Sequence, residues 1–463
     1  MPATLERAHG STHHGVQALQ TSLTKAEWDA FSSRFISPDG RVVDIERGGV
    51  SHSEGQAYGM LLAVAADDKE AFSRIYSFTW NHMRGRSDSL ISWIYNPKQY
   101  PRITDTNNAT DGDIIFAYSL VLGALKWDEP RFLHAAQPII DQIGDDLLVR
   151  RAGYKIVRPA AFGFDSGHAD GPVINLSYYI YGAFLLFYDV TGEQRWMDVW
   201  RSGLELTEAA VSISRGFAPD WATLRSDRWL NPANGFAHKS SYDAVRIPLY
   251  MALNGKVPAG AFAQFHRTWN ERGRGAPKDF HLEHRATLAD MNDPGYRAIA
   301  AIAACAAAGT PLPRDLQRVR PTTYFATALH LMSLVAVRTN YPWCADPIDV
   351  PDTVLIASAQ AQSVPAEAPM SADGARMAAL DGIAAANDQR PTWSHTGELH
   401  TAGNASSGFG TRAVPDRLES FAPEKPPAFQ KGGHFARADC GAKCPSVWNF
   451  SLADTLLSVF GLD

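Results

Sequence analysis

The sequence predicts an all-α protein built from ten or more helices. Between Lys25 and Val337, apolar residues recur at the spacing of three and four that places them on one face of a helix. The strict alternation typical of half-buried strands is scarce. Helices of this number suit either an α-solenoid or a closed ring of helical hairpins. No period of about 34 to 45 residues repeats the same letters, which argues against the solenoid.

The expected helices are separated by clusters of Gly, Pro, Asn and Asp, which favour turns. In chain order, the helices are expected over residues 25–35, 55–84, 110–127, 130–149, 174–190, 193–214, 240–254, 258–271, 295–307 and 322–337.

Several of these boundaries carry recognisable local signals. After the first helix, "SPDGRVVD" is typical of a turn. The segment "TDGD" offers a helix cap with acids in the first turn, where the helix dipole favours negative charge. Pro130 in "DEPRF" lies near a helix start, where a missing N–H is tolerated.

The composition is that of a globular protein. Of the 463 residues, 45% are hydrophobic and 20% charged, so the chain can bury a large core. The formal net charge is -6 at pH 7 with acids and bases interspersed, so no basic surface for nucleic acid is expected. No apolar run approaches the roughly 18 residues of a membrane span.

We expect three parts along the chain: an N-terminal segment, 1–20; a helical domain, 21–343; and an extension, 344–463, rich in Ala, Pro, Ser and Gly. The extension ends in "PSVWNFSLADTLLSVFGLD", which predicts a short helix that docks on the helical domain or binds a partner. The N-terminal segment lacks the apolar region of a signal peptide, so either export does not occur or the signal was removed.

Four cysteines lie late in the chain: Cys305, Cys344, Cys440 and Cys444. The spacing in "CGAKC" is too wide for the common CxxC metal or redox motif. One or two disulfides and free buried thiols are both compatible with this pattern.

Three segments each place a carboxylate beside glycine or aromatic residues at a predicted helix start or loop end. In "SEGQAYGM", Glu54 precedes Gly55 and Gly59, each of which costs about 1 kcal/mol relative to Ala inside a helix. We therefore expect something to approach the backbone closely there.

The other two segments have simpler explanations when each is taken alone. In "NNATDGDIIFAYSL", Asp111 and Asp113 flank Gly112, as a helix cap and a dipole-favoured acid would. In "SYDAVRIPL", Asp243 and Arg246 are three residues apart and could form a local ion pair.

Taken together, the three acids point to chemistry, because a ring of helices would bring them to one end of one cavity. Two carboxylates across a groove with aromatic walls are what glycoside hydrolysis requires. One must be protonated to donate to the leaving oxygen and the other ionised to activate water or attack carbon. Their environments must therefore push their pKa values apart.

The segments "SEGQAYGML", "ATDGDIIFAYSL" and "SYDAVRIPL", in this order, resemble the signatures of glycoside hydrolase family 8, in particular those of its members in bacterial cellulose-synthesis systems. The resemblance covers roughly residues 25–340. It implies an (α/α)6 barrel with an open substrate cleft at one end. The implied activity is inverting hydrolysis of internal β-1,4 bonds of a glucan chain, with no metal or organic cofactor.

By the same resemblance, Glu54 is the proton donor, kept protonated by apolar surroundings, and its glycines let the sugar chain come close. Asp243 is the base, held ionised and oriented by Arg246. Asp111 binds and helps distort the sugar next to the scissile bond. For inversion, the carboxyl groups of Glu54 and Asp243 should lie about 6.5–9.5 Å apart to admit a water.

Two aromatic residues complete the implied site: Trp93 in "LISWIY", which stacks on a glucose ring, and Tyr178 in "NLSYY", near the attacking water, with Tyr179 as the alternative. Asp113 has no assigned partner. Three further residues lie near the motifs, but structural roles explain them at least as well: His52, Lys239 and Trp221.

The resemblance also implies a periplasmic or secreted monomer, with components of a cellulose-synthase complex as candidate partners. One alternative is the same fold acting on chitosan, xylan or mixed-linkage glucan. Two others are a non-catalytic polysaccharide-binding component of a secretion complex and a helical polysaccharide lyase.

Overall fold

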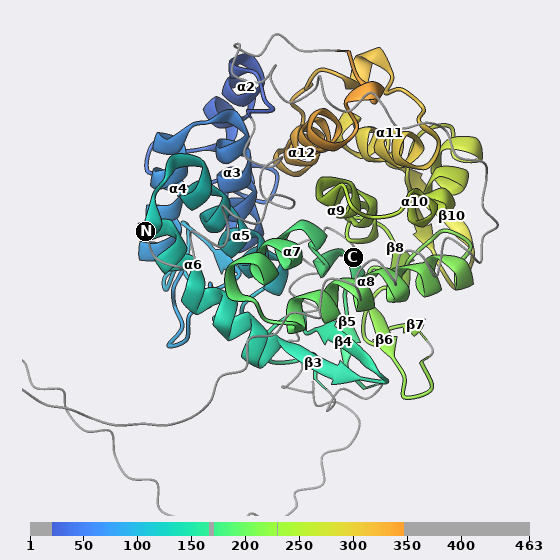
Figure 1. Ribbon diagram of the computed structural model, residues 1–463, viewed down its shortest axis with the longest axis horizontal. Helices are drawn as coiled ribbons and strands as arrows, with labels where there is room; N and C mark the ends of the chain where they lie inside the picture. Colours follow the sequence, from blue (N-terminus) through green and yellow to red (C-terminus); the bar gives the residue numbers. More distant parts are fainter. Residues whose placement is uncertain (1–20, 166–170, 229, 347–463) are drawn as a thin grey trace, which may run out of the picture. The chain divides into compact units, whose positions relative to one another are not determined.

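The computed structural model describes residues 21–165, 171–228 and 230–346, and this part of the chain is mainly helical (Figure 1). Its α-helices are, in order, α2 (Lys25–Phe35), α3 (Ser53–Ala66), α4 (Lys69–His82), α5 (Thr110–Trp127), α6 (Pro130–Gln142), α7 (Tyr181–Thr191), α8 (Arg195–Ile213), α9 (Ile247–Asn254), α10 (Ala259–His266), α11 (Pro294–Ala308) and α12 (Tyr324–Asn340).

The helices form an (α/α)6 barrel, which confirms the predicted architecture. Helices α3, α5, α7, α9 and α12 contact one another in series, α12 closes the ring against α3, and α11 lies beside both α9 and α12. Helices α4, α6 and α8 pack outside α3, α5 and α7, while α10 packs against α11 (Figure 1). The inner helices are apolar on almost every side because both their faces are covered.

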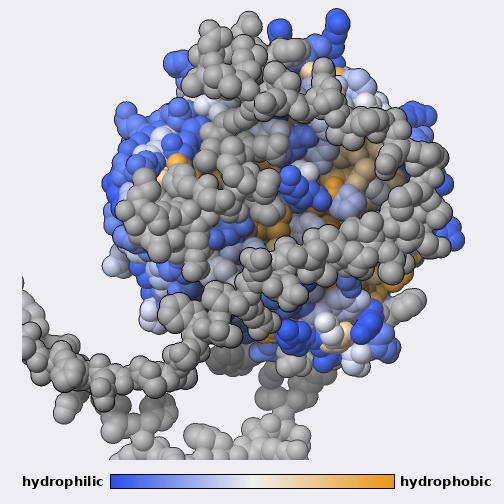
Figure 2. Space-filling view, in the orientation of Figure 1, coloured by the Kyte–Doolittle hydropathy of each residue, from blue (hydrophilic) through white to orange (hydrophobic). Residues whose placement is uncertain are grey.

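Aromatic side chains pack within the outer layer and between the outer and inner layers of one large core. Phe72 of α4 packs edge-on against Phe132 of α6 with ring centroids 4.9 Å apart, and Trp196 of α8 stacks on Phe184 of α7. All four rings are buried, and burying a side chain of this size stabilises the fold by about 1.5–3 kcal/mol. In the space-filling view, hydrophilic side chains dominate the visible rim and hydrophobic ones appear toward the middle (Figure 2).

Short antiparallel strands lie in the connections between helices. They form the pairs β1–β2 (Ser51–His52, Ile94–Tyr95) and β3–β4 (Leu148–Arg151, Tyr154–Val157) and the three-stranded sheets β5–β6–β7 (Val173–Ile174, Ala222–Leu224, Leu230–Pro232) and β8–β9–β10 (Lys239–Ser240, Lys278–His281, Ala286–Asp290).

Several predicted helices are divided or shorter in the structure. The stretch 55–84 is two helices, because Asp67 has a left-handed conformation with φ 60° and Asp68 then caps α4 by accepting from Ala71 N. The stretch 130–149 leaves the α-helix at Gln142, passes through a π-helical turn, Ile143–Leu147, and ends in β3.

Two further predicted helices, 174–190 and 240–254, each begin with a strand and a 3₁₀ turn. The first includes β5 and the turn η3, Leu176–Tyr178, before α7. The second includes β8 and the turn η4, Ala244–Arg246, before α9. Apolar spacing alone does not distinguish a buried strand or 3₁₀ turn from a helix.

Cys305 of α11 and Cys344 form a disulfide, with Cα atoms 6.1 Å apart. Cys440 and Cys444, the N-terminal segment 1–20 and all but the first residues of the extension lie outside the described residues. The three-part division of the chain remains a prediction. Within residues 21–165, 171–228 and 230–346, no helix is long and apolar enough to cross a membrane.

Candidate active site

One cavity of about 250 Å³ lies where the amino-terminal ends of inner helices meet. Ser53 and Glu54 line it from the start of α3, Asp111 from α5 and Tyr324 from α12. The turns η3 and η4, which precede α7 and α9, also contribute. Helix amino termini carry partial positive charge, so this end of the barrel favours carboxylates.

Arg246 joins the three predicted carboxylates. Its Nη1 donates to Asp111 Oδ2 at 3.0 Å and to Glu54 Oε1, while Nη2 donates to Asp243 Oδ1. The Arg246 side chain is only 4% exposed. The structure thus brings three acids that are far apart in the sequence to one guanidinium group. Arg246 forms the expected local pair with Asp243 and also binds Glu54 and Asp111.

A single cation does not compensate the three carboxylates, of which Asp111 is buried and Glu54 and Asp243 are partly exposed. Burial, reinforced by the charge of Glu54, raises the pKa of Asp111 to about 8 despite its contact with Arg246. Burial also raises the pKa of Asp243, although Arg246 and the Asn175 side chain oppose that rise. Burial disfavours the charged form of Arg246, but the surrounding acids, Glu54 first, raise its pKa well above its ordinary value. The cluster therefore carries a proton at neutral pH.

The surroundings of Glu54 are polar, not apolar as predicted. Its Oε1 accepts from Tyr58 Oη at 2.7 Å and contacts Arg246. Tyr58 Oη also shares a 2.5 Å hydrogen bond with Tyr250 Oη, and burial raises the pKa of both phenols. The carboxyl is held between a phenol and a guanidinium, which fixes its orientation.

The glycines around Glu54 were predicted to make room for the sugar chain, but in the structure they make room for protein atoms. A Cβ added to Gly55 would lie 2.7 Å from Tyr324 Oη, and one added to Gly59 would lie 2.7 Å from Val42 Cγ2. A Cβ on Gly112 would lie 2.4 Å from Ser53 Oγ and 2.8 Å from Glu54 N. Gly112 thus lets the starts of α3 and α5 touch, which brings Glu54 and Asp111 to the same guanidinium.

Trp93 and Tyr178 both line the cavity. Trp93 Nε1 donates to Asp105 Oδ2 at 2.9 Å, and its ring stacks on His52 with centroids 5.9 Å apart. Tyr179 is completely buried and does not line the cavity, so the position favours Tyr178 of the two alternatives. Burial and the neighbouring carboxylates raise the pKa of Tyr178 well above its ordinary value.

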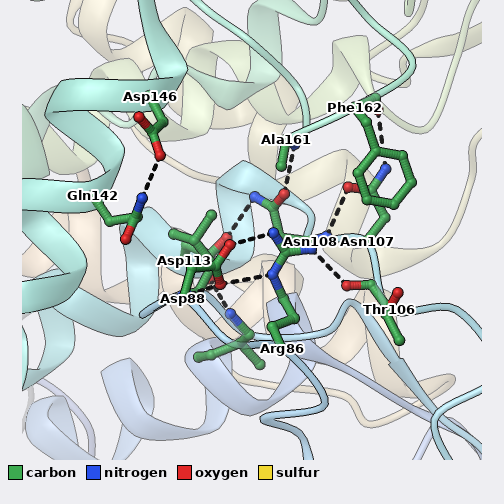
Figure 3. Close-up of polar contacts among 12 residues, drawn as sticks. Arg86, Asp88, Thr106, Asn107, Asn108, Asp113, Gln142, Asp146, Ala161 and Phe162 are labelled. Atoms are coloured by element: carbon green, nitrogen blue, oxygen red, sulfur yellow. Dashed lines mark hydrogen bonds and ion pairs between the residues drawn. The ribbon is translucent and has the colours of Figure 1, made fainter. Parts of the chain in front are cut away.

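Asp113 does not line the cavity, and its carboxylate forms hydrogen bonds to residues of neighbouring loops (Figure 3). Its Oδ1 accepts from Ile91 N and its Oδ2 from Asn108 Nδ2, each at 2.8 Å. Asn108 Oδ1 in turn accepts from Ala161 N at 2.7 Å. Burial raises the pKa of Asp113 to about 7. These contacts give Asp113 a structural role close to the loop that carries Trp93.

Among the other residues noted near the motifs, His52 and Trp221 line the cavity, and Lys239 in β8 does not. Within the described part of the chain, no group of three or more His, Cys, Asp or Glu side chains is arranged to hold a metal ion.

The sequence analysis missed several residues of the cavity and its support. Tyr58 could have been found, because it lies four residues after Glu54 on the same helix face. Half-buried Tyr242, Tyr296 and Phe325 form an aromatic wall, with the first two ring centroids 5.7 Å apart. Asp220 carried no spacing signal, since its partners are brought to it only by the fold.

Comparisons with known proteins agree with this geometry. A probable endoglucanase of Novacetimonas hansenii is 32% identical over 312 residues, which are 67% of this chain and 90% of that protein. A solved endo-β-1,4-glucanase from Acetobacter xylinum superposes with a TM-score of 0.61 at 30% identity, covering 70% of this chain and 99% of that one. A family 8 endoglucanase from Klebsiella pneumoniae also gives 0.61, at 28% identity over 68% and 99% of the two chains.

Residues 1–339 match the sequence profile described as glycosyl hydrolases family 8. The match includes all three acids that meet on Arg246 and the helices that carry them. The chain therefore belongs to glycoside hydrolase family 8.

Proposed function

We propose that this protein is an endo-β-1,4-glucanase that cleaves cellulose-type glucan with inversion. The observation that carries the proposal is the meeting of Glu54, Asp111 and Asp243 on Arg246 in one cavity with aromatic walls. The relatives named endoglucanase support the choice of a β-1,4-glucan as substrate.

Glu54 is the proposed proton donor. It shares Arg246 Nη1 with Asp111, the carboxyl group whose pKa burial raises to about 8. Transfer of a proton from Glu54 to the glycosidic oxygen makes the sugar a better leaving group. The Glu54 carboxylate left by this step is stabilised by Arg246 and Tyr58, which already bind it.

Asp243 is the proposed base, taking a proton from the water that attacks the anomeric carbon on the opposite face. Arg246 and Asn175 favour its ionised form against the effect of burial. Tyr178, which lines the cavity from the neighbouring turn η3, is the proposed partner that orients that water. The Glu54–Asp243 separation of about 6.5–9.5 Å remains a prediction.

Asp111 and Trp93 are proposed to bind the sugar. A largely protonated Asp111 can donate a hydrogen bond to a sugar oxygen as well as accept one from Arg246. Trp93 lies on the cavity wall with its indole N–H already bonded to Asp105, which holds the ring in place for stacking.

The acids outside the catalytic group do not favour the cationic alternative substrate, chitosan. Asp44 lies 3.6 Å from Arg47 and 3.4 Å from His52, and Glu46 accepts from Tyr324 N. Arg47 compensates the charge of Asp44, so of these two acids only Glu46 keeps a charge that could attract a polyamine.

We further propose that the protein acts as a monomer in the periplasm or outside the cell, in connection with cellulose synthesis. Glucan polymers lie outside the cytoplasm, and the Cys305–Cys344 disulfide is typical of proteins that fold in an oxidising compartment.

The test is hydrolysis of soluble carboxymethylcellulose by the wild type, Glu54→Gln and Asp243→Asn. A rapid fall in viscosity with few new reducing ends, lost in both variants, is expected. Glu27→Gln is the matched control, because Glu27 is a buried acid paired with an arginine, Arg338, and does not line the cavity. Its activity should stay at the wild-type level.

Proton NMR of the first products should show the α-anomer, as single displacement on a β-linkage requires. Initial formation of the β-anomer would refute the inverting mechanism. Chitosan as the preferred substrate would replace the glucan assignment, unsaturated ends absorbing in the near ultraviolet would indicate a lyase, and binding without cleavage would indicate a non-catalytic component.

A further inference from the structure

Asp243 occupies the N-cap position of η4 but does not cap it. An aspartate at this position ordinarily accepts a backbone N–H of the first helical turn through its side chain. In this structure the Asp243 side chain makes no such bond and instead contacts Arg246 Nη2. The N–H groups of Val245 and Arg246 donate to Ser241 O and Asp243 O, so the N–H of the first residue of the turn, Ala244, is the one that needs another acceptor.

Asp220 supplies that acceptor. Its Oδ1 accepts from Ser241 N at 2.8 Å and from Ala244 N at 2.9 Å, so its two bonds bracket Asp243 in the sequence. Asp220 is itself fixed, because its own N–H donates to Lys239 O at 2.8 Å and its side chain is buried. It does not line the cavity, so any effect it has on the reaction must act through Asp243.

We propose that Asp220 is a positioning residue that caps the turn in place of Asp243 and thereby leaves the Asp243 carboxylate directed at Arg246 and the attacking water. This inference rests on the proposed function, in which Asp243 is the base. It adds a residue that neither the motifs nor the cavity lining identify.

The structure also indicates what Asp243 would do without this partner. Asp111 Oδ1 accepts from the N–H of the residue that follows it, Gly112, at 2.8 Å. The same local bond is open to Asp243 and Ala244 N once Asp220 is removed. A carboxylate turned to its own backbone would lie away from the water, and a misplacement of about 1 Å can cost on the order of 10²-fold in rate.

The charge of Asp220 has a second measurable effect, on the pKa of Asp243. Burial and then the charge of Asp243 raise the pKa of Asp220 well above its ordinary value. The interaction is reciprocal, so at any pH where Asp220 is ionised, an uncharged residue at 220 should lower the pKa of the base. The other groups that face Asp243 stay in place, and they are Arg246 of η4, Glu54 of α3, Asp111 of α5 and Tyr178 of η3.

The experiment measures kcat, KM and thermal stability on carboxymethylcellulose for Asp220→Ala and Asp220→Asn. Asp220→Ala should lower kcat on the order of 10²-fold with KM within about twofold. Asp220→Asn keeps an oxygen acceptor for both N–H groups, so its kcat should be close to that of the wild type. The acid limb of its kcat/KM profile should move to lower pH, because the pKa of the base falls.

Asp68→Ala is the matched control, since Asp68 caps α4 away from the cavity by accepting from Ala71 N at 2.8 Å. It should lower the melting temperature and leave kcat unchanged. In an Asp243→Asn background, Asp220→Ala should cause no further loss of activity, because both changes act on the same step.

The inference is overturned if Asp220→Ala keeps the wild-type kcat, or if its loss is as large in the Asp243→Asn background as in the wild type. If Asp220→Ala does not fold, Asp220→Glu takes its place, because the longer side chain moves the carboxylate off both N–H groups, and a wild-type kcat in that variant overturns the inference equally. A wild type without hydrolytic activity, or an Asp243→Asn variant as active as the wild type, would instead remove the proposed function.

Discussion

Replacing Gly112 with alanine should separate the starts of α3 and α5 with little change in the rest of the barrel. The added Cβ would lie 2.4 Å from Ser53 Oγ and 2.8 Å from Glu54 N. Ordinary contacts of this kind begin near 3.4 Å, so the two helix starts must move apart by roughly 0.6 Å to relieve the contact with Glu54 N and by roughly 1 Å to relieve the contact with Ser53 Oγ. The backbone N–H of Glu54 is among the atoms displaced, and a rotamer change does not relieve that contact.

The expected result is a large loss of rate with a small loss of stability. Overpacking costs about 1–3 kcal/mol, but alanine regains up to about 1 kcal/mol of helix propensity relative to glycine. A shift of about 1 Å between Glu54 and Asp111 should lower kcat on the order of 10²-fold.

The assay is kcat on carboxymethylcellulose together with the melting temperature. Gly123→Ala on the same helix is the control, because its Cβ would lie 3.0 Å from Phe72 and Trp127 side-chain atoms, away from the cavity. That variant should lose stability and keep kcat. A Gly112→Ala protein with wild-type kcat would show that close contact between α3 and α5 does not set the geometry of the acids.

Three other predictions concern pH, substrate binding and the disulfide. Because the pKa of Asp111 in the folded protein, about 8, lies above its ordinary 3.8, the wild type should lose stability as pH rises from about 4 to 8. Asp111→Asn should flatten that slope by up to about 1.4 kcal/mol per pH unit while losing activity, and an unchanged slope in pH-dependent denaturant melts would contradict the assignment. Trp93→Ala should raise KM up to roughly tenfold, since an aromatic contact contributes about 0.5–1.5 kcal/mol, whereas Trp80→Ala, at a half-buried ring stacked on Arg84 outside the cavity, should not. Reduction of the Cys305–Cys344 disulfide, which spans 39 residues, should lower the free energy of unfolding by about 2–4 kcal/mol with kcat retained, and Cys305→Ser should then be insensitive to reductant.

The local sequence was sufficient to predict the boundaries of helices whose start and stop signals agree with their apolar spacing. The ranges 25–35 and 110–127 coincide with α2 and α5. A capping box at Thr24 marks the start of α2, whereas α5 starts without the side-chain cap predicted in "TDGD" and has Asp111 and Asp113 in its first turn, where the helix dipole favours acids. The local sequence was insufficient to predict the boundaries where one apolar run changes conformation, as at 174–190. There, packing against neighbouring segments decides whether a stretch is a strand, a 3₁₀ turn or a helix.

The sequence by itself determined the chemical groups of the site, because Glu54, Asp111 and Asp243 stand in short motifs whose letters can be read directly. Only the tertiary structure decided what surrounds them. Tyr324 fills the space beside Gly55, and Asp220 caps the turn that bears Asp243. Each of these contacts joins segments that are distant in the chain, and closing the ring of helices is what places them within bonding distance.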